Sequence, residues 1–171
     1  MEDFTNDTID TKALPRYEQV TLTSLQASYW NVVALGVSAV FVLLFAALIT
    51  IFYLVEEVVE QKPLLFGGLA ILFVLVLFLS RVSFRKKAYA FRQHDVIYRN
   101  GIIATNTMVI PYNRVQHVAL HEGLVSRWFG LAKLEIFTAG GVSSDIEIPG
   151  IRKEEAENIK QLLMGKIQKQ L

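Results

Sequence analysis

The sequence predicts a membrane hairpin of two transmembrane helices, followed by a small all-β barrel or sandwich that a C-terminal helix caps. Three observations point to this fold class. Only 19% of the 171 residues are charged, 53% are hydrophobic, and the mean hydropathy is +0.38. Two long uncharged segments hold much of the apolar excess, and short strand-like segments follow them. An ordinary soluble domain is nearer a quarter charged, so part of this chain lies in lipid.

The first predicted transmembrane helix covers residues 30–55. It lies within a stretch from Glu18 to Glu56 that has no charged residue between its ends. About 20 apolar residues in a helix are enough to cross the hydrocarbon core of a bilayer. Trp30 and Tyr53 stand where interfacial aromatic residues are expected. These features together predict a span rather than a soluble helix.

The second predicted transmembrane helix covers residues 63–84, and Pro63 suits its first turn, where no N–H is needed. The alternative is a buried helical hairpin in a soluble protein, which we disfavour because so small a chain cannot cover both segments on all sides. The uncharged cores of both spans argue against a carrier or channel, which normally needs charge within the membrane.

The charges beside the spans predict the topology. Residues 56–62, the loop between the spans, contain three Glu and one Lys, whereas five basic residues follow the core of the second span: Arg81, Arg85, Lys86, Lys87 and Arg92. Cytoplasmic loops carry the excess of Lys and Arg, so the loop faces outward and both termini face the cytoplasm. Residues 1–12 are expected to be a flexible tail and residues 13–29 a cytoplasmic juxtamembrane segment, too acidic for a signal peptide.

The remaining residues, 85–171, have the sequence pattern of a β domain. Short runs of β-branched and aromatic residues alternate with turn residues. Asn100-Gly101 predicts a two-residue hairpin turn. Out-of-phase apolar residues in 114–122 predict a bulge or two-sided burial, and 123–130 predict a short helical turn. The expected strands cover residues 88–92, 95–99, 102–104, 106–111, 114–122, 131–138 and 145–149.

The last predicted element is an amphipathic helix that begins at about Arg152. Its apolar residues recur on one face, which predicts that the helix closes the open end of the strand layer. A helix that seeks a groove on another protein is the alternative. The face is formed by Ala156, Ile159, Leu162, Leu163, Ile167 and Leu171.

Three motifs in this domain resemble those of a known family. They are IPYNRVQHV at residues 110–118, RWFGLA at 127–132 and FTAG at 137–140. In this order they closely resemble the bacterial PH-like domain of the YdbS-like membrane proteins, over about residues 20–168. The resemblance implies a PH-like fold on a membrane hairpin in the bacterial inner membrane. It implies no enzyme activity, and it carries no catalytic residues to this chain.

The sequence offers no convincing catalytic or metal site. With no cysteine, disulfides, thiolate metal sites and cysteine nucleophiles are excluded. His117 and His121 are four residues apart, but on a strand that spacing is about 13 Å, too far to share a metal ion. No serine lies in a nucleophile elbow, and no phosphate-binding loop is present. We therefore expect no catalytic residues, no metal, no cofactor and no small-molecule substrate, and the net charge of +1 argues against nucleic acid.

Two sets of residues are candidates for binding. The five basic residues after the second span hold its cytoplasmic end and attract anionic lipid headgroups. A second set lies in and beside the family-like motifs, and either it has a structural role or it forms a recognition patch for a partner: Arg114, Gln116, His117, Arg127 and Trp128. The sequence thus predicts a non-catalytic, membrane-anchored PH-like interaction or scaffold module that binds another membrane protein, a related PH-domain protein or a second copy. The alternative is a domain that senses anionic lipid at the membrane surface.

Overall fold

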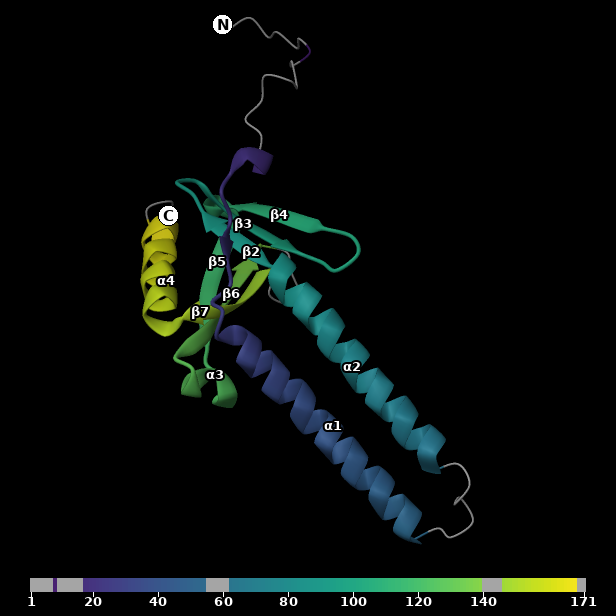
Figure 1. Ribbon diagram of the computed structural model, residues 1–171. Coiled ribbons are helices and arrows are strands. Elements are labelled where there is room, and N and C mark those ends of the chain that lie inside the picture. The colour runs from purple at the N-terminus through teal and green to yellow at the C-terminus, as the bar shows by residue number, and fades with distance from the viewer. Residues whose placement is uncertain (1–7, 9–16, 55–61, 140–145, 169–171) are drawn as a thin grey trace, which may run out of the picture.

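The computed structural model describes residues 8, 17–54, 62–139 and 146–168. Two long helices, α1 (Tyr29–Leu54) and α2 (Lys62–Lys86), extend side by side from a β domain (Figure 1). Both are long and apolar enough to span a membrane, and almost none of their apolar residues are buried in the protein. The soluble-core alternative does not hold for such exposed helices, because their apolar surface needs lipid around it.

Aromatic side chains join the two helices along their length. The rings of Phe41 and Phe73 lie 4.9 Å apart, and Phe66 packs between Phe45 and Phe52, with ring centroids 6.2 and 5.5 Å away. Such tilted and stacked pairs add to the packing of one helix on the other. The hairpin is therefore a packed pair rather than two independent spans.

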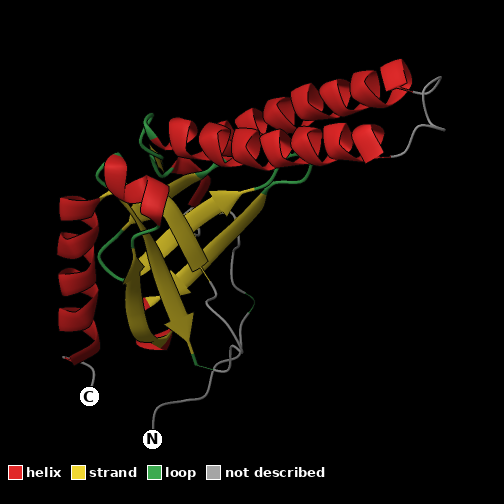
Figure 2. Cartoon of the chain, turned by 90° about the horizontal axis from the view of Figure 1, so that it is seen from below, coloured by secondary structure: helices red, strands yellow, loops and turns green. Residues whose placement is uncertain are grey.

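The domain contains two antiparallel sheets that face each other without closing into a barrel (Figure 2). The first has the order β1-β2-β3-β4 and the second β5-β6-β7. A 3-10 turn, η1 (Tyr17–Gln19), precedes the strands, and η3 (Tyr112–Arg114) links the sheets. The strands are β1 (Thr23–Ser24), β2 (Ala88–Phe91), β3 (Asp95–Asn100), β4 (Asn106–Pro111), β5 (Val115–His121), β6 (Leu131–Thr138) and β7 (Ile146–Arg152). The PH-like fold predicted for the domain is confirmed.

Two helices complete the domain: α3 (Leu124–Trp128), between β5 and β6, and α4 (Lys153–Gln168), at the end. Ala156 and Leu163 of α4 are fully buried in the core formed by both sheets, which confirms the predicted role of this helix. Leu162, expected on the same stripe, is instead 49% exposed because it lies at the border of the packed face. The predicted bulge is present as a register shift between Val115 and His117.

The hairpin is inserted within the first sheet. Ser24 of β1 pairs with Ala88 of β2, so the two membrane helices connect adjacent strands. This strand was not expected, and the segment before α1 is part of the domain: Leu25 is buried in the core, and Gln26 N–H donates to the Gly150 carbonyl at 3.1 Å. Both ends of the hairpin are thus fixed to the domain.

The two-residue turn predicted at Asn100-Gly101 is wrong, as is the strand predicted for residues 102–104. Asn100 pairs with Asn106, so a five-residue loop, 101–105, joins β3 to β4. The observed register places Met108 and Ile110 against the core, whereas a tight turn would oppose polar Thr105 to a core position. Burial of the strand face therefore decides the register over the local turn signal.

Several expectations concern residues outside the described ranges. They include most of the N-terminal tail, most of the loop at residues 56–62, residue 145 of the last expected strand, and Leu171 of the helical face. The expected topology, with both termini in the cytoplasm, stays a prediction.

Candidate functional site

The junction between the hairpin and the domain gathers basic and aromatic side chains. The Arg81 guanidinium lies over the Trp30 ring at 4.7 Å and the Phe84 ring at 5.4 Å. Phe84 also contacts Tyr29, with ring centroids 6.3 Å apart. Cation–π contacts of this kind hold a charge at the border of an apolar region. Arg81 is thereby held in place where α2 meets the domain.

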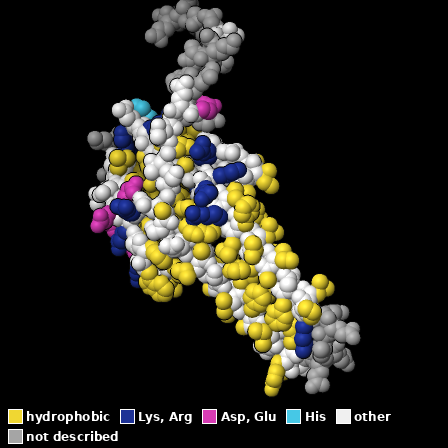
Figure 3. All heavy atoms as spheres, viewed as in Figure 1, with side chains coloured by type: hydrophobic (Ala, Val, Ile, Leu, Met, Phe, Trp, Pro, Cys, Tyr) yellow, Lys and Arg dark blue, Asp and Glu magenta, His cyan; other side chains and the backbone are white. Residues whose placement is uncertain are grey.

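Three further basic residues follow at the end of α2 (Figure 3). Arg85 and Lys86 are exposed, and the Lys86 ammonium donates a hydrogen bond to the Ile102 carbonyl in the β3–β4 loop. Lys87 is half-buried, and this burial lowers the pKa of its ammonium, an effect that Glu147 partly opposes. Arg85 and Lys86 are thus the exposed charges among the three.

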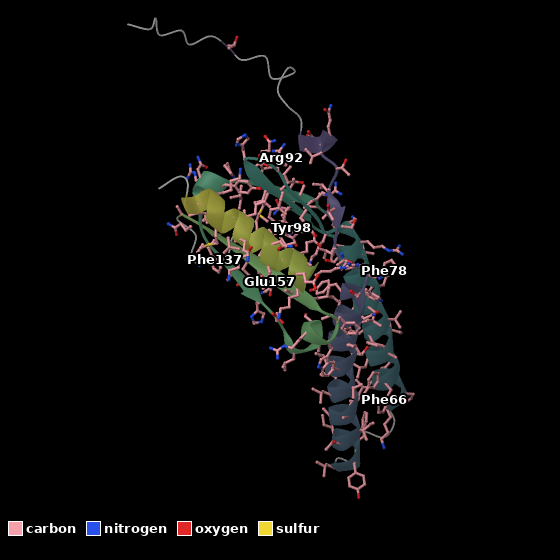
Figure 4. All side chains as sticks on the ribbon, turned by 90° about the vertical axis from the view of Figure 1, so that its left-hand side faces the viewer. Phe66, Phe78, Arg92, Tyr98, Phe137 and Glu157 are labelled. Atoms are coloured by element: carbon pink, nitrogen blue, oxygen red, sulfur yellow. The ribbon has the colours of Figure 1, made fainter. Side chains whose placement is uncertain are left out.

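Arg92 does not belong to this group. It lies in the turn between β2 and β3, at the end of the domain remote from the hairpin (Figure 4). Its guanidinium forms a two-pronged ion pair with Asp95, which raises the pKa of Arg92, and its carbonyl accepts a hydrogen bond from the Tyr112 hydroxyl at 2.6 Å. These contacts give Arg92 a structural role in the turn. The four basic residues 81, 85, 86 and 87 are the ones that stand at the junction.

A cavity of about 330 Å³ lies between the ends of the two helices and the β3–β4 loop. Its wall is largely apolar, with three hydroxyls and one ammonium, and is formed by Tyr29, Val33, Val76, Leu79, Ser80, Ser83, Phe84, Lys87 and Ile102. The cavity contains no carboxylate, imidazole or thiol that could act as a general base or nucleophile. The polar groups of the wall come from Tyr29, Ser80, Ser83 and Lys87, and the rest of it is apolar.

The five candidate partner-binding residues fall into two groups. Arg114, Gln116 and His117 are exposed where η3 passes into β5, close to the end remote from the hairpin, because Tyr112 N–H donates to the His94 carbonyl. Arg127 and Trp128 are exposed on α3, beyond the other end of β5. A strand rises about 3.3 Å per residue, so the length of β5 separates the groups.

Ion pairs attach α3 to the rest of the domain. Glu122, at the end of β5, accepts from Lys153 at 2.9 Å and lies 3.9 Å from the Arg127 Nε. The hydrogen bond with Glu122 raises the pKa of Lys153. Gly130 adopts a positive φ, at +64°, and its carbonyl accepts from Lys153 N–H at 3.0 Å. Arg127 thus lies near an acidic side chain, that of Glu122.

The described residues offer no group of three His, Asp or Glu side chains that could hold a metal ion. His117 instead stacks on the Phe137 ring across the two strands, with centroids 4.1 Å apart. Glu147 of β7 pairs with Lys133 at 3.2 Å. His117 and Glu147 thus each contact a side chain of β6.

Comparison with known families extends the fold description. The model of the family described as "Bacterial PH domain" matches residues 20–167, which include β1, both membrane helices and nearly all of α4. The chain belongs to the bacterial PH domain family. In this bacterial PH domain the family match begins before the hairpin, in agreement with the pairing of β1 and β2. No solved structure matches the chain.

Two curated relatives of this bacterial PH domain are transmembrane proteins of Bacillus subtilis (strain 168). UPF0699 transmembrane protein YdbT is 30% identical over 119 residues, which cover 67% of this chain and 24% of YdbT. UPF0699 transmembrane protein YdbS is 30% identical over 87 residues, or 51% of this chain and 53% of YdbS. The chain thus matches about half of one relative and a quarter of the other. The expected resemblance to YdbS-like membrane proteins is confirmed.

Sequence reasoning missed three parts of the junction. β1 is two residues long and pairs with a strand on the far side of the hairpin, so no local pattern reveals it. Ile103 was assigned to a strand, although it lies in a loop and is 98% exposed. Gly150, with a φ of +66°, lies against the Tyr29 ring. The Pro149-Gly150 pair is a turn signal that could have suggested a special backbone position there.

Proposed function

We propose that this bacterial PH domain is a membrane-anchored, non-catalytic interaction module that binds another membrane protein carrying a related domain. The observation that supports this proposal is an unpaired strand edge beside an exposed polar patch. Within the described residues β4 pairs with β3 alone, and the chain passes from β4 through η3 to Arg114, Gln116 and His117. We call β4 and these three residues the distal surface.

Edge strands present unpaired N–H and C=O groups that can add a strand from a partner. Val109 of β4 is 41% exposed, and Arg114 is an exposed arginine next to this edge. Arginine is enriched among the residues that dominate protein interfaces. The similarity to a quarter of YdbT supports a partner of the same kind, since a segment like this chain occurs within a longer transmembrane protein.

The anchoring of the domain favours membrane proteins as partners. β1 and β2 hold the domain at the ends of α1 and α2, with residues 25–28 between β1 and α1 and Lys87 alone between α2 and β2. A protein confined to the same membrane therefore meets the distal surface at a raised effective concentration. We infer that the termini face the cytoplasm, because the basic residues at the junction exceed those in the loop between the helices.

The test is affinity purification of the full-length protein from its own membranes in mild detergent, followed by mass spectrometry of bound protein and lipid. We expect a stoichiometric membrane partner, and we expect V109K and R114E to reduce its recovery about tenfold or more. The matched control is L162K, because Leu162 is similarly exposed, at 49%, but lies on α4. Unchanged recovery with V109K and R114E would contradict the distal surface.

Recognition of anionic lipid is a second candidate, favoured by Arg85 and Lys86 at the junction. Each basic residue near a charged membrane surface contributes about 1 kcal/mol. In the same purification, anionic lipid without a protein partner would favour this candidate. Co-purification of a differently tagged copy would instead identify a homo-oligomer.

A further inference from the structure

The exposed apolar side chains of the domain lie beside the hairpin. Ile103, in the β3–β4 loop, is 98% exposed, and Leu124 and Trp128 on α3 are 80% and 79% exposed. The loop and α3 lie on either side of the point where α1 and α2 enter the domain (Figure 1). Figure 3 shows apolar side chains gathered at both places, with Lys and Arg between them on the same face. The two exposed clusters therefore share one level, at the domain end of the hairpin.

Rigid attachment of the hairpin determines which face of the domain meets the membrane. Only residues 25–28 separate β1 from α1, and only Lys87 separates α2 from β2. The Tyr29 ring packs against Gly150 so closely that a Cβ there would lie 2.4 Å from the Tyr29 Cγ. Phe84 contacts both Tyr29 and Trp30. When the hairpin spans a bilayer, the loop and α3 are consequently held at its surface and cannot swing away.

The side chains near these clusters suit the lipid interface rather than the hydrocarbon core. Trp is enriched at the headgroup level because its ring is apolar and its N–H is polar. Arg127 lies on α3 and Lys153 begins α4, and both pair with the carboxylate of Glu122. Lys86, which donates to the Ile102 carbonyl, stands beside the loop. Basic residues at this depth reach the phosphate level with their apolar stems in the interface.

We propose that the domain rests on its own membrane at two points, where α3 inserts Leu124 and Trp128, and the β3–β4 loop inserts Ile103, into the lipid interface. The occupant of this surface is the bilayer leaflet on the domain side, of any headgroup charge. The contact lies at the other end of β5 from Arg114, Gln116 and His117, and it does not depend on a protein partner. It assigns Trp128 to lipid contact, whereas the sequence alone placed it in a patch with His117.

The chain provides a direct probe, because it has two tryptophans, Trp30 and Trp128. The variant W30F keeps an aromatic ring beside Phe84 and leaves Trp128 as the sole reporter. We would reconstitute it in uncharged phosphatidylcholine vesicles, at less than one chain per vesicle, with bromine on the acyl chains near the glycerol. We expect the fluorescence emission of Trp128 to be blue-shifted relative to that of a tryptophan in water. The brominated lipid should quench most of this emission, whereas aqueous acrylamide should quench it only weakly.

Two further reporters in the W30F/W128F background complete the test. I103W places the reporter on the loop and should behave as Trp128 does. Q93W, in the exposed turn between β2 and β3 at the remote end, should be quenched by acrylamide and untouched by brominated lipid. The proposal is overturned if Trp128 and I103W behave as Q93W does. It is equally overturned if either is shielded from both quenchers, which would mean a protein contact.

Discussion

Tyr112 connects the turn that contains Arg92 to the core of the domain. Its ring is 2% exposed, its hydroxyl donates to the Arg92 carbonyl, and burial raises its pKa from the ordinary 10.0 to about 12. Burial raises the pKa of Tyr98 in the first sheet to about 12 as well. Both phenols lose their protons more readily in the unfolded chain than in the folded one. Their contribution to stability is full below pH 10 and is lost as the pH rises through about 12.

The variant Y112F should therefore change stability in two ways. At neutral pH it leaves the Arg92 carbonyl without its partner, which costs about 1–3 kcal/mol. Between pH 10 and about 12 its stability should fall less steeply than that of the unchanged protein, because one titrating group is gone. Thermal unfolding in detergent across this range measures both effects. Y53F is the control, since Tyr53 is 87% exposed on α1, and an equal slope for Y112F would contradict the prediction.

At the scale of elements, Gly150 decides how α1 meets β7. It has a φ of +66°, and a Cβ would lie 2.6 Å from the Tyr29 Cβ, which belongs to the start of the helix and cannot move aside alone. G150A should therefore combine the backbone strain of about 1–2 kcal/mol with displacement of α1. Hydrogen exchange should detect the displacement of α1, because the Gln26 amide, which donates to the Gly150 carbonyl, should lose its protection from exchange.

Gly130 provides the matched control for this substitution. Its φ of +64° is almost the same, but nothing lies within 4 Å of a Cβ built there. G130A should show the backbone strain alone and leave the Gln26 amide protected. If G150A and G130A lower stability equally and both spare that amide, Gly150 does not position the hairpin.

The elements that were predicted from the sequence are those with a local signal. Long uncharged runs identify α1 and α2, and apolar residues that recur every four positions identify α4. The β3–β4 loop was assigned incorrectly because Asn100-Gly101 is a strong turn signal, whereas the register depends on Met108 and Ile110 meeting a core that the other sheet completes. β1 depends wholly on a partner strand beyond the hairpin.

The candidate sites show the same dependence on long-range contacts. The sequence grouped Arg92 with the four basic residues at the junction, but β2 carries it to the remote end of the domain. It grouped Arg114 with Trp128 by motif, whereas the length of β5 separates them. Motif membership indicates which residues matter to the family fold, but only the path of the strands shows which of them can meet one ligand.

For the whole molecule, the pairing of Ser24 with Ala88 predicts that the hairpin can be removed. A chain in which a short glycine-containing linker joins Gln26 to Lys87 should fold as a water-soluble domain, because β1 and Leu25 remain in place. Residues 88–171 alone lack the buried Leu25 and the strand before it, and should be less stable by about 2–5 kcal/mol. Chemical denaturation measures the free energy of unfolding of each chain, and the two values can then be compared. Equal stability would show that β1 contributes nothing to the domain.

The insertion of the hairpin between two paired strands also constrains biosynthesis. β1 leaves the ribosome first, but its partner β2 is not made until both membrane helices have been synthesised. When the hairpin crosses a bilayer, the first sheet can form only after the second helix has returned the chain to the side on which β1 lies. Folding of the domain thus reports correct membrane insertion, because a chain whose second helix failed to cross would leave β1 and β2 on opposite sides of the membrane.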